Sequence, residues 1–180
     1  MRGENQKNQT KLKGKKMKIN YLDIDSGKSH LLHIPVPWVY LIAYLVGIVI
    51  QLAYPISISS TLILEITRIL GAVLLVVGVA IIVWAQLIFH KEHTTTDPTQ
   101  TSLKLITWGP YLFTRNPMYI GLFLTFIGID GILTFVWSLI LLLPVLYYVN
   151  WIVIPVEETQ LKKTFGKTYE DYCKRVRRWI

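Results

Sequence analysis

Cysteine and charge are both scarce in this chain. Cys173 is the single cysteine among the 180 residues, so no disulfide can form within the chain. Charged residues make up only 17% of the sequence, whereas soluble domains contain about 25%. Hydrophobic residues make up 52% and fall into long runs with little or no charge. These features argue against a soluble domain and predict an integral membrane protein.

The few charges are mostly basic and lie near the two ends. The formal net charge is +8, and Lys and Arg cluster between Arg2 and Lys18 and again between Lys162 and Arg178. No nucleic-acid recognition motif accompanies them, so we expect no nucleic-acid partner. Basic segments beside apolar spans instead follow the positive-inside rule and attract anionic membrane lipids. Both termini are therefore predicted to be cytoplasmic.

Prolines and charges divide the rest of the chain into apolar segments. Residues 1–34 are polar and form a basic N-terminal tail, and residues 35–180 are predicted to form a single domain. The predicted spans are residues 37–54, 62–89 and 132–154, with a shorter apolar run at 118–129. We therefore predict an all-α, polytopic membrane bundle of about four spans.

The last two apolar runs are expected to form a helical hairpin. Residues 118–129 are too few to cross a bilayer alone, so this helix extends beyond Asp130-Gly131 or turns back there. We place the turn around Asp130-Gly131, with Asp130 at the membrane interface. In the second span, Gly71 and Gly78 are a heptad apart and predict close packing with another helix.

The segment after the last span is amphipathic. Its apolar residues recur at helical spacing, and Gly166 is placed as a helix end, which predicts two short helices. Thr168 and Asp171 have the spacing of a capping box. One face of these helices is expected to cover the membrane or the preceding loop, while the basic face contacts lipid phosphates.

An even number of spans places three polar segments together on the cytoplasmic side. They are the loop 90–107, the segment Gly109–Gly121 (the proline block) and the C-terminal tail. Arg115 offers a planar fork for a carboxylate or phosphate. The proline block also carries Tyr111, Asn116 and Tyr119, which suit a small zwitterion. A purely structural alternative is that these groups only anchor helix ends at the membrane surface.

Two neighbouring carboxylates follow the last span. Glu158 has Lys162 at i+4, so an ion pair between them is expected. Glu157 has Leu161 at the same spacing and is therefore the better candidate for a ligand contact. His90 and His93, with Glu92 and Asp97, do not have zinc-site spacing, so no metal site is predicted.

The proline block reads Gly-Pro-Tyr-Leu-Phe-Thr-Arg-Asn-Pro-Met-Tyr-Ile-Gly. A hairpin-length apolar tract follows it, then Glu157-Glu158, Phe165-Gly166, Tyr169, Tyr172 and the ending Val176-Arg177-Arg178-Trp179. This combination resembles the isoprenylcysteine carboxyl methyltransferase family and the related phospholipid methyltransferases. The resemblance runs from about residue 95 to 180, which would be the cofactor-binding part.

The resemblance implies methyl transfer from S-adenosylmethionine at the cytoplasmic membrane face. Carried over by position, it implies a cofactor site lined by Ile106, Tyr111, Asn116, Pro117, Met118 and Tyr119 and contacted by Glu157, with Thr107 and Gly109 shaping the approach. From the chemistry of their side chains, we also predict Arg115 and Glu157 as catalytic residues and Glu158 as a cofactor-binding residue.

The implied acceptor is an amphipathic molecule, such as a prenylcysteine-like carboxylate, a lipid head or another small lipophilic compound. Many family members carry histidine where this chain has Asn116, and the prenylcysteine enzymes carry arginine where it has Val153. The second departure weighs against a prenylcysteine acceptor. Two other functions remain open: a membrane reductase of the sterol-reductase type using NADPH, and a non-catalytic membrane or lipid-binding protein.

Overall fold

The computed structural model describes residues 35–57, 60–92 and 104–180, so the expected N-terminal tail 1–34 lies outside it. The described residues belong to one compact unit, Ile34–Ile180. Regular structure in this part of the chain is helical throughout, as expected of an all-α protein. The elements are α2 (Val36–Ala53), α3 (Thr61–Lys91), η3 (Gly109–Leu112), α4 (Pro117–Leu133), α5 (Val136–Tyr148), η4 (Val149–Val153), α6 (Ile154–Phe165) and α7 (Lys167–Arg175).

The first two long helices begin and end close to the predicted positions. Helix α2 begins after Pro35 and has a proline in its first turn, where the missing N–H group costs no hydrogen bond. Helix α3 begins after Ser60, whose hydroxyl accepts a 3.5 Å hydrogen bond from the Ile63 N–H. Lys91 lies in its last turn, where positive charge complements the helix dipole.

Helix α4 corrects the position expected for the hairpin turn. Asp130 and Gly131 lie inside this helix, which continues to Leu133. It ends because Thr134 takes a left-handed conformation with φ 59°, and the N–H of Phe135 returns to the carbonyl oxygen of Asp130 at 3.1 Å. Asp130 is also buried among the helices, with 5% of its surface exposed.

The last span is longer than predicted because it does not stop at Pro155. Helices α5 and α6 join through the π-helical turn η4 into one helix, Val136–Phe165. Pro155 lacks an N–H donor and its ring crowds the preceding turn, which explains the wider turn just before it. Gly166, with φ 52°, then separates α6 from α7 as expected. The capping box was wrong: Gly166 caps α7 without a side-chain hydrogen bond.

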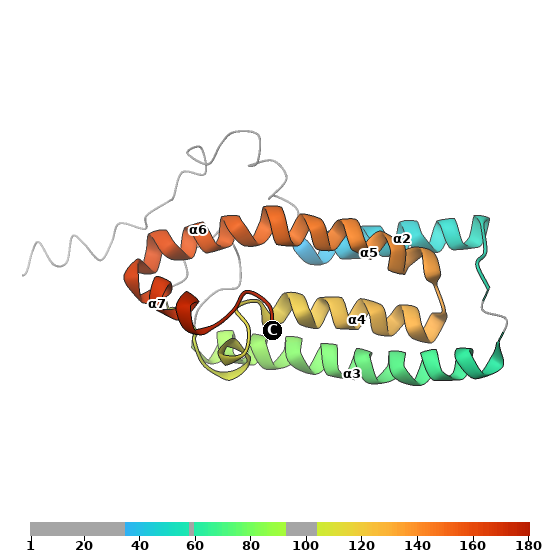
Figure 1. Cartoon of the computed structure of the whole chain (residues 1–180), viewed down its shortest axis with the longest axis horizontal. Coiled ribbons are helices and arrows are strands. Elements are labelled where there is room, and N and C mark those ends of the chain that lie inside the picture. The colour runs from blue at the N-terminus through green and yellow to red at the C-terminus, as the bar shows by residue number, and fades with distance from the viewer. Residues whose placement is uncertain (1–34, 58–59, 93–103) are drawn as a thin grey trace, which may run out of the picture. The chain divides into compact units, whose positions relative to one another are not determined.

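Helices α3 and α4 lie side by side along their length (Figure 1). A Cβ atom on Gly78 would lie 2.6 Å from the backbone nitrogen of Thr125 and 2.7 Å from the carbonyl oxygen of Gly121. Gly71 makes a similar approach to Gly128, where a Cβ atom would lie 2.7 Å from the carbonyl oxygen. The predicted packing role of Gly71 and Gly78 is confirmed, because only hydrogen fits between these backbones.

Three helices are long and apolar enough to cross a membrane: α2, α3 and the continuous helix α5–η4–α6. Helix α4 has 17 residues, which at about 1.5 Å per residue falls slightly short of the ~30 Å apolar layer. Many large apolar side chains of these helices are exposed, as expected of surfaces that face lipid. The chain is therefore a helical membrane protein.

Candidate functional site

The proline block folds as a short helix, an irregular corner and the start of α4. Gly109 has φ 66°, a left-handed conformation that favours glycine, and it starts η3. Pro117 is buried and occupies the first turn of α4, where a proline is tolerated. The corner between these elements carries Arg115 and Asn116.

Three of the predicted cofactor residues gather against the end of α3. Ile106 and Tyr111 are buried with Ala85 and Ile88, and Met118 packs against this cluster. The Tyr172 hydroxyl donates a 2.8 Å hydrogen bond to the carbonyl oxygen of Tyr111, which ties α7 to η3. Burial raises the pKa of the Tyr111 hydroxyl, so its ring stays neutral.

Tyr119 connects the proline block to α6. Its hydroxyl donates a 2.6 Å hydrogen bond to Oε1 of Glu157, while its ring packs against the core around Tyr40 and Ile154. None of the ion pairs within the described residues includes Glu157. Its carboxylate is thus held in place by a neutral donor and not by a cationic side chain.

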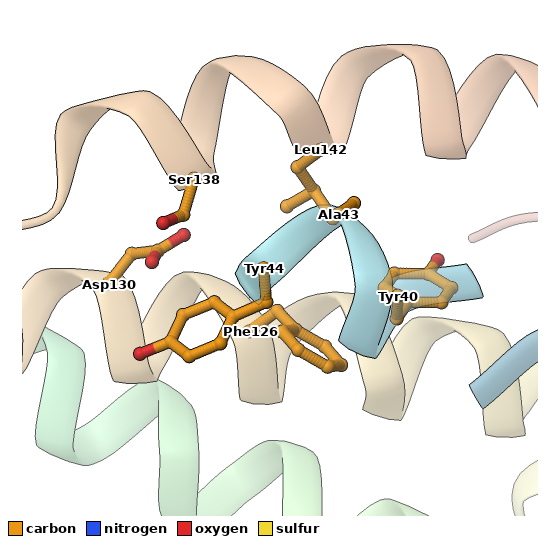
Figure 2. A pocket seen from close by; sticks show the side chains of 7 residues that line it. All are labelled: Tyr40, Ala43, Tyr44, Phe126, Asp130, Ser138 and Leu142. Carbon is orange, nitrogen blue, oxygen red and sulfur yellow. The ribbon is translucent and has the colours of Figure 1, made fainter. Parts of the chain in front are cut away.

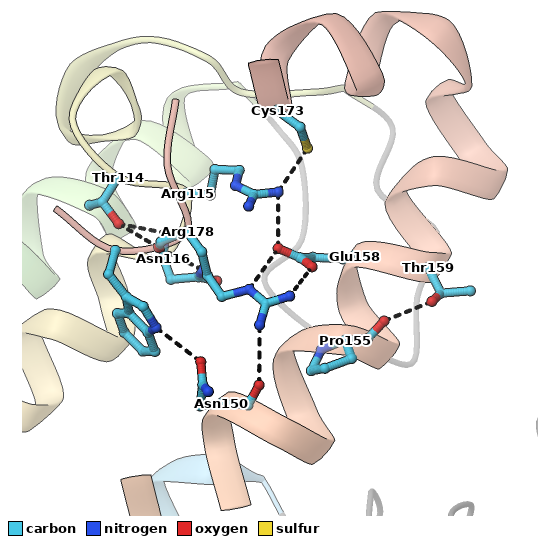
Figure 3. Close-up of polar contacts among 10 residues, drawn as sticks. Thr114, Arg115, Asn116, Asn150, Pro155, Glu158, Thr159, Cys173 and Arg178 are labelled. Atoms are coloured by element: carbon cyan, nitrogen blue, oxygen red, sulfur yellow. Dashed lines mark hydrogen bonds and ion pairs between the residues drawn. The ribbon is translucent and has the colours of Figure 1, made fainter. Parts of the chain in front are cut away.

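Glu158 pairs with two arginines, and the expected pair with Lys162 is wrong. Arg115 Nη1 lies 3.0 Å from Glu158 Oε1, and Arg178 Nη2 lies 2.6 Å from Oε2 (Figure 3). Lys162 instead pairs with Glu170 at 2.8 Å, because α7 folds back beside α6. Burial opposes the positive charge of Arg115, but Glu158, Cys173 and Tyr169 together outweigh it and raise the pKa of the guanidinium.

The C-terminal segment 176–180 lies across the corner of the proline block. The Thr114 hydroxyl and the Asn116 side-chain amide donate to the carbonyl oxygen of Arg178 at 2.9 and 3.0 Å. The Arg115 N–H donates to the carbonyl oxygen of Arg177 at 3.0 Å. The basic ending therefore contributes Arg178 to the interior of this region, which sequence reasoning missed when it assigned the basic residues to lipid phosphates. The sequence did contain a signal for such a cation, because the adjacent carboxylates of Glu157 and Glu158 repel each other and favour a positive side chain nearby.

Two further groups complete the surroundings of Arg115. Its Nη1 atom donates to Cys173 Sγ at 2.8 Å, and its Nε atom is buried without a hydrogen-bond partner among the described residues. The same guanidinium thus combines occupied donors with one unused donor. A buried unused donor marks a place where a ligand oxygen would be stabilised.

A pocket of about 390 Å³ lies beside this region. It is lined by Ile120, Phe123, Leu146, Tyr147, Asn150, Trp151 and Trp179. The Trp179 indole N–H donates to Asn150 Oδ1 at 2.9 Å, which fixes the C-terminal segment as one wall. The lining is mostly apolar, as in many sites for small lipophilic ligands.

The structure places the predicted site residues in three neighbouring groups. Ile106, Tyr111 and Met118 lie against α3. Tyr119 and Glu157 form the second group. Arg115, Asn116 and Glu158 form the third, together with the unpredicted Arg178.

No group of His, Cys, Asp and Glu that could hold a metal was found in the part of the chain that the structure describes. His93 and Asp97 lie outside that part. Glu92, at the end of α3, forms an ion pair with Lys104.

Comparison with known proteins assigns the chain to a family. No curated protein and no solved structure shows significant similarity to it. A family model described as phospholipid methyltransferase matches residues 66–168, from α3 into the start of α7. This match contains the proline block and both glutamates and covers more than half of the 180 residues. The chain therefore belongs to the phospholipid methyltransferase family of membrane methyltransferases.

Proposed function

We propose that this protein transfers a methyl group from S-adenosylmethionine to an amphipathic acceptor at the cytoplasmic face of a membrane. The observation that carries the proposal is the position of Glu157. Tyr119 holds its carboxylate with a 2.6 Å hydrogen bond, and no ion pair within the described residues includes it. A carboxylate placed in this way suits a positively charged or hydroxyl-bearing cofactor.

The side chains of the site fit S-adenosylmethionine in charge. Its sulfonium and ammonium groups and its ribose hydroxyls suit Glu157, while its carboxylate suits the unused Nε donor of Arg115. We propose that Ile106, Tyr111, Asn116, Pro117, Met118 and Tyr119 form the surrounding cofactor site. Both oxygens of Glu158 are already bound by Arg115 and Arg178, so we assign Glu158 a positioning role.

The cofactor supplies the methyl group when it is bound, and the protein supplies alignment and protection from water. Methyl transfer is an in-line displacement, so the donor and acceptor must be held along one axis. Tyr119 packs against the core and holds Glu157 through its hydroxyl, and the segment 176–180 covers the corner of the proline block. These contacts pre-organise the site before the reactants meet.

The apolar pocket supports a lipophilic acceptor. Ile120 and Phe123 belong to α4, the helix that also carries Tyr119, so the pocket begins one residue beyond the proposed cofactor contact. We propose that the acceptor places its hydrocarbon part in this pocket and its head group toward Glu157. A lipid could reach the pocket from the bilayer, because Tyr147 and Trp151 in its wall are exposed.

The test measures cofactor binding and methyl transfer with purified full-length protein in lipid nanodiscs. We expect methyl-labelled S-adenosylmethionine to bind, and its label to enter the lipid fraction of the source membranes. Glu157→Gln should weaken binding at least tenfold, because it removes the charge but keeps the shape. The matched control is Glu170→Gln, whose glutamate pairs with exposed Lys162 and should leave binding unchanged.

Two outcomes would contradict the proposal. One is undetectable binding of S-adenosylmethionine to folded protein. The other is a Glu157→Gln variant that binds and transfers methyl groups as well as the control. Tight binding of NADPH in the same assay would favour the reductase alternative.

A further inference from the structure

Three polar side chains with buried oxygen atoms meet at the other end of α4 from the proline block. Asp130 comes from α4, Ser138 from α5 and Tyr44 from α2. Asp130 and Ser138 are only 5% and 4% exposed. Asp130 Oδ1, Ser138 Oγ and the Tyr44 hydroxyl all lack a hydrogen-bond partner among the described residues. Unpaired polar atoms inside an apolar bundle are costly, so the cluster calls for a ligand.

The three side chains line one small cavity. Its volume is about 10 Å³, and Tyr40, Ala43, Phe126 and Leu142 complete its wall. Figure 2 shows Asp130 and Ser138 facing each other and the Tyr44 ring reaching toward the same end of the cavity. A volume of roughly 10–15 Å³ is the minimum that holds one water molecule.

The helices cannot close this space by moving together. A Cβ atom on Gly47 would lie 2.5 Å from Cα of Ser138, so the backbones of α2 and α5 already touch one turn from Tyr44. The ring of Phe126 packs between two tyrosines, at 5.2 Å from the Tyr40 ring and 5.7 Å from the Tyr44 ring. The contacts around the cavity are thus already tight.

The chemistry of the wall distinguishes water from a metal cation. Three unpaired oxygens, from Tyr44, Asp130 and Ser138, belong to residues that line the cavity. This number matches a buried water, which typically makes about three hydrogen bonds. Hard divalent cations take roughly six or more oxygen ligands. The remaining wall is largely apolar, and the Tyr40 hydroxyl lies on the side away from Asp130 (Figure 2).

We propose that this cavity binds a single water molecule, which joins α2, α4 and α5 through Tyr44, Asp130 and Ser138. The water donates a hydrogen bond to Asp130 Oδ1 and accepts one from each of the Tyr44 and Ser138 hydroxyl groups. It satisfies three buried polar atoms at once and fixes the α4–α5 hairpin against α2. This site is separate from the methyltransferase site and does not depend on the proposed function.

The experiment is a double-variant cycle that removes the two hydroxyl groups. Tyr44→Phe, Ser138→Ala and the double variant are compared by thermal unfolding of full-length protein in nanodiscs. Each single change should lower Tm, and the double change should lower it by less than the sum, because both act through the same water. Tyr147→Phe, which removes a hydroxyl from an exposed tyrosine of α5, should leave Tm unchanged.

Strictly additive losses, or single variants with the Tm of the parent, would overturn the proposal. Exchange of Na⁺ for choline should not change Tm, and a Na⁺-dependent shift would assign the cavity to a cation instead. If a variant does not fold, a high-resolution density map of the parent protein tests directly whether the cavity contains a water molecule. It should show one peak within hydrogen-bond distance of all three oxygens, and an empty cavity would contradict the water site.

Discussion

The α3–α4 interface and the polar network at the proline block hold the molecule together by opposite means. Along α3 and α4, glycines bring backbone against backbone, with Gly78 lying against Gly121 and Thr125. At the proline block, Glu158 collects Arg115 and Arg178 from distant parts of the chain. The α3–α4 interface depends on glycines, which have no side chain to separate the backbones. The polar network depends on the charge and length of its arginine and glutamate side chains.

This difference teaches where function can be placed in a small membrane protein. Close backbone packing leaves no room for a ligand and gives a rigid support. A network of charged groups is directional, so it can leave selected atoms unused, such as Arg115 Nε. The support and the site share α4, which starts in the network at Pro117 and continues along α3.

The largest effect is expected from filling the glycine contact. Gly78→Ile places a side chain 2.6 Å from the Thr125 backbone, which cannot move aside without separating the helices. We expect a loss of about 3 kcal/mol in the free energy of unfolding. Thermal and denaturant unfolding in a fixed detergent would measure it.

Ala80→Ile is the matched control, since Ala80 is an exposed residue of the same helix. It should unfold like the parent protein. Equal losses in the two variants would show that the glycine contact is not what holds α3 and α4 together.

An intermediate effect is expected from removing the shared carboxylate of the polar network. Glu158→Ala leaves Arg115 and Arg178 facing each other with most of their side chains covered (17% and 29% exposed). We expect a loss of about 2 kcal/mol, because two partly buried cations lose their counter-charge. Unfolding experiments and proteolysis of the C-terminal segment would report it.

Glu170→Ala breaks an exposed ion pair with Lys162 and provides the comparison. It should cost much less than Glu158→Ala, since solvent screens such exposed pairs. If the two variants lose the same stability, the network contributes no more than an ordinary surface pair.

The smallest effect is expected from the single hydrogen bond between α7 and η3. Tyr172→Phe removes the donor to the carbonyl oxygen of Tyr111 and should cost about 1 kcal/mol. Burial raises the pKa of the Tyr172 hydroxyl from 10.0 to about 12, so the folded state favours the protonated hydroxyl, which can donate the hydrogen bond. The stability from this group is complete below pH 10 and is lost as the pH rises toward 12.

The Tyr172→Phe variant should therefore lose less stability than the parent protein between pH 10 and 12. Unfolding curves across that range would check the sign, and Tyr147→Phe serves as the exposed control. A variant with the same alkaline loss as the parent would contradict the assignment to Tyr172.

The sequence by itself determined the fold class and the main helices. Hydropathy and proline positions placed α2 and α3 within a few residues, because apolar length and helix ends are local properties. The heptad of Gly71 and Gly78 predicted the close approach of another helix for the same reason, and the structure shows that this helix is α4. The contact between the proline block and Glu157 also followed, once the hairpin returned α6 to that side.

Only the tertiary structure decided which charges meet. Local spacing favoured a pair of Glu158 with Lys162, yet α7 turns at Gly166 and brings Glu170 to that lysine. Glu158 is then reached by Arg178, twenty residues along the chain, and by Arg115 from the proline block. Asp130 likewise became a buried residue because α2 and α5 cover it. Helix periodicity reports neighbours within a helix, while ion pairs between helices depend on turns and on packing that no local pattern contains.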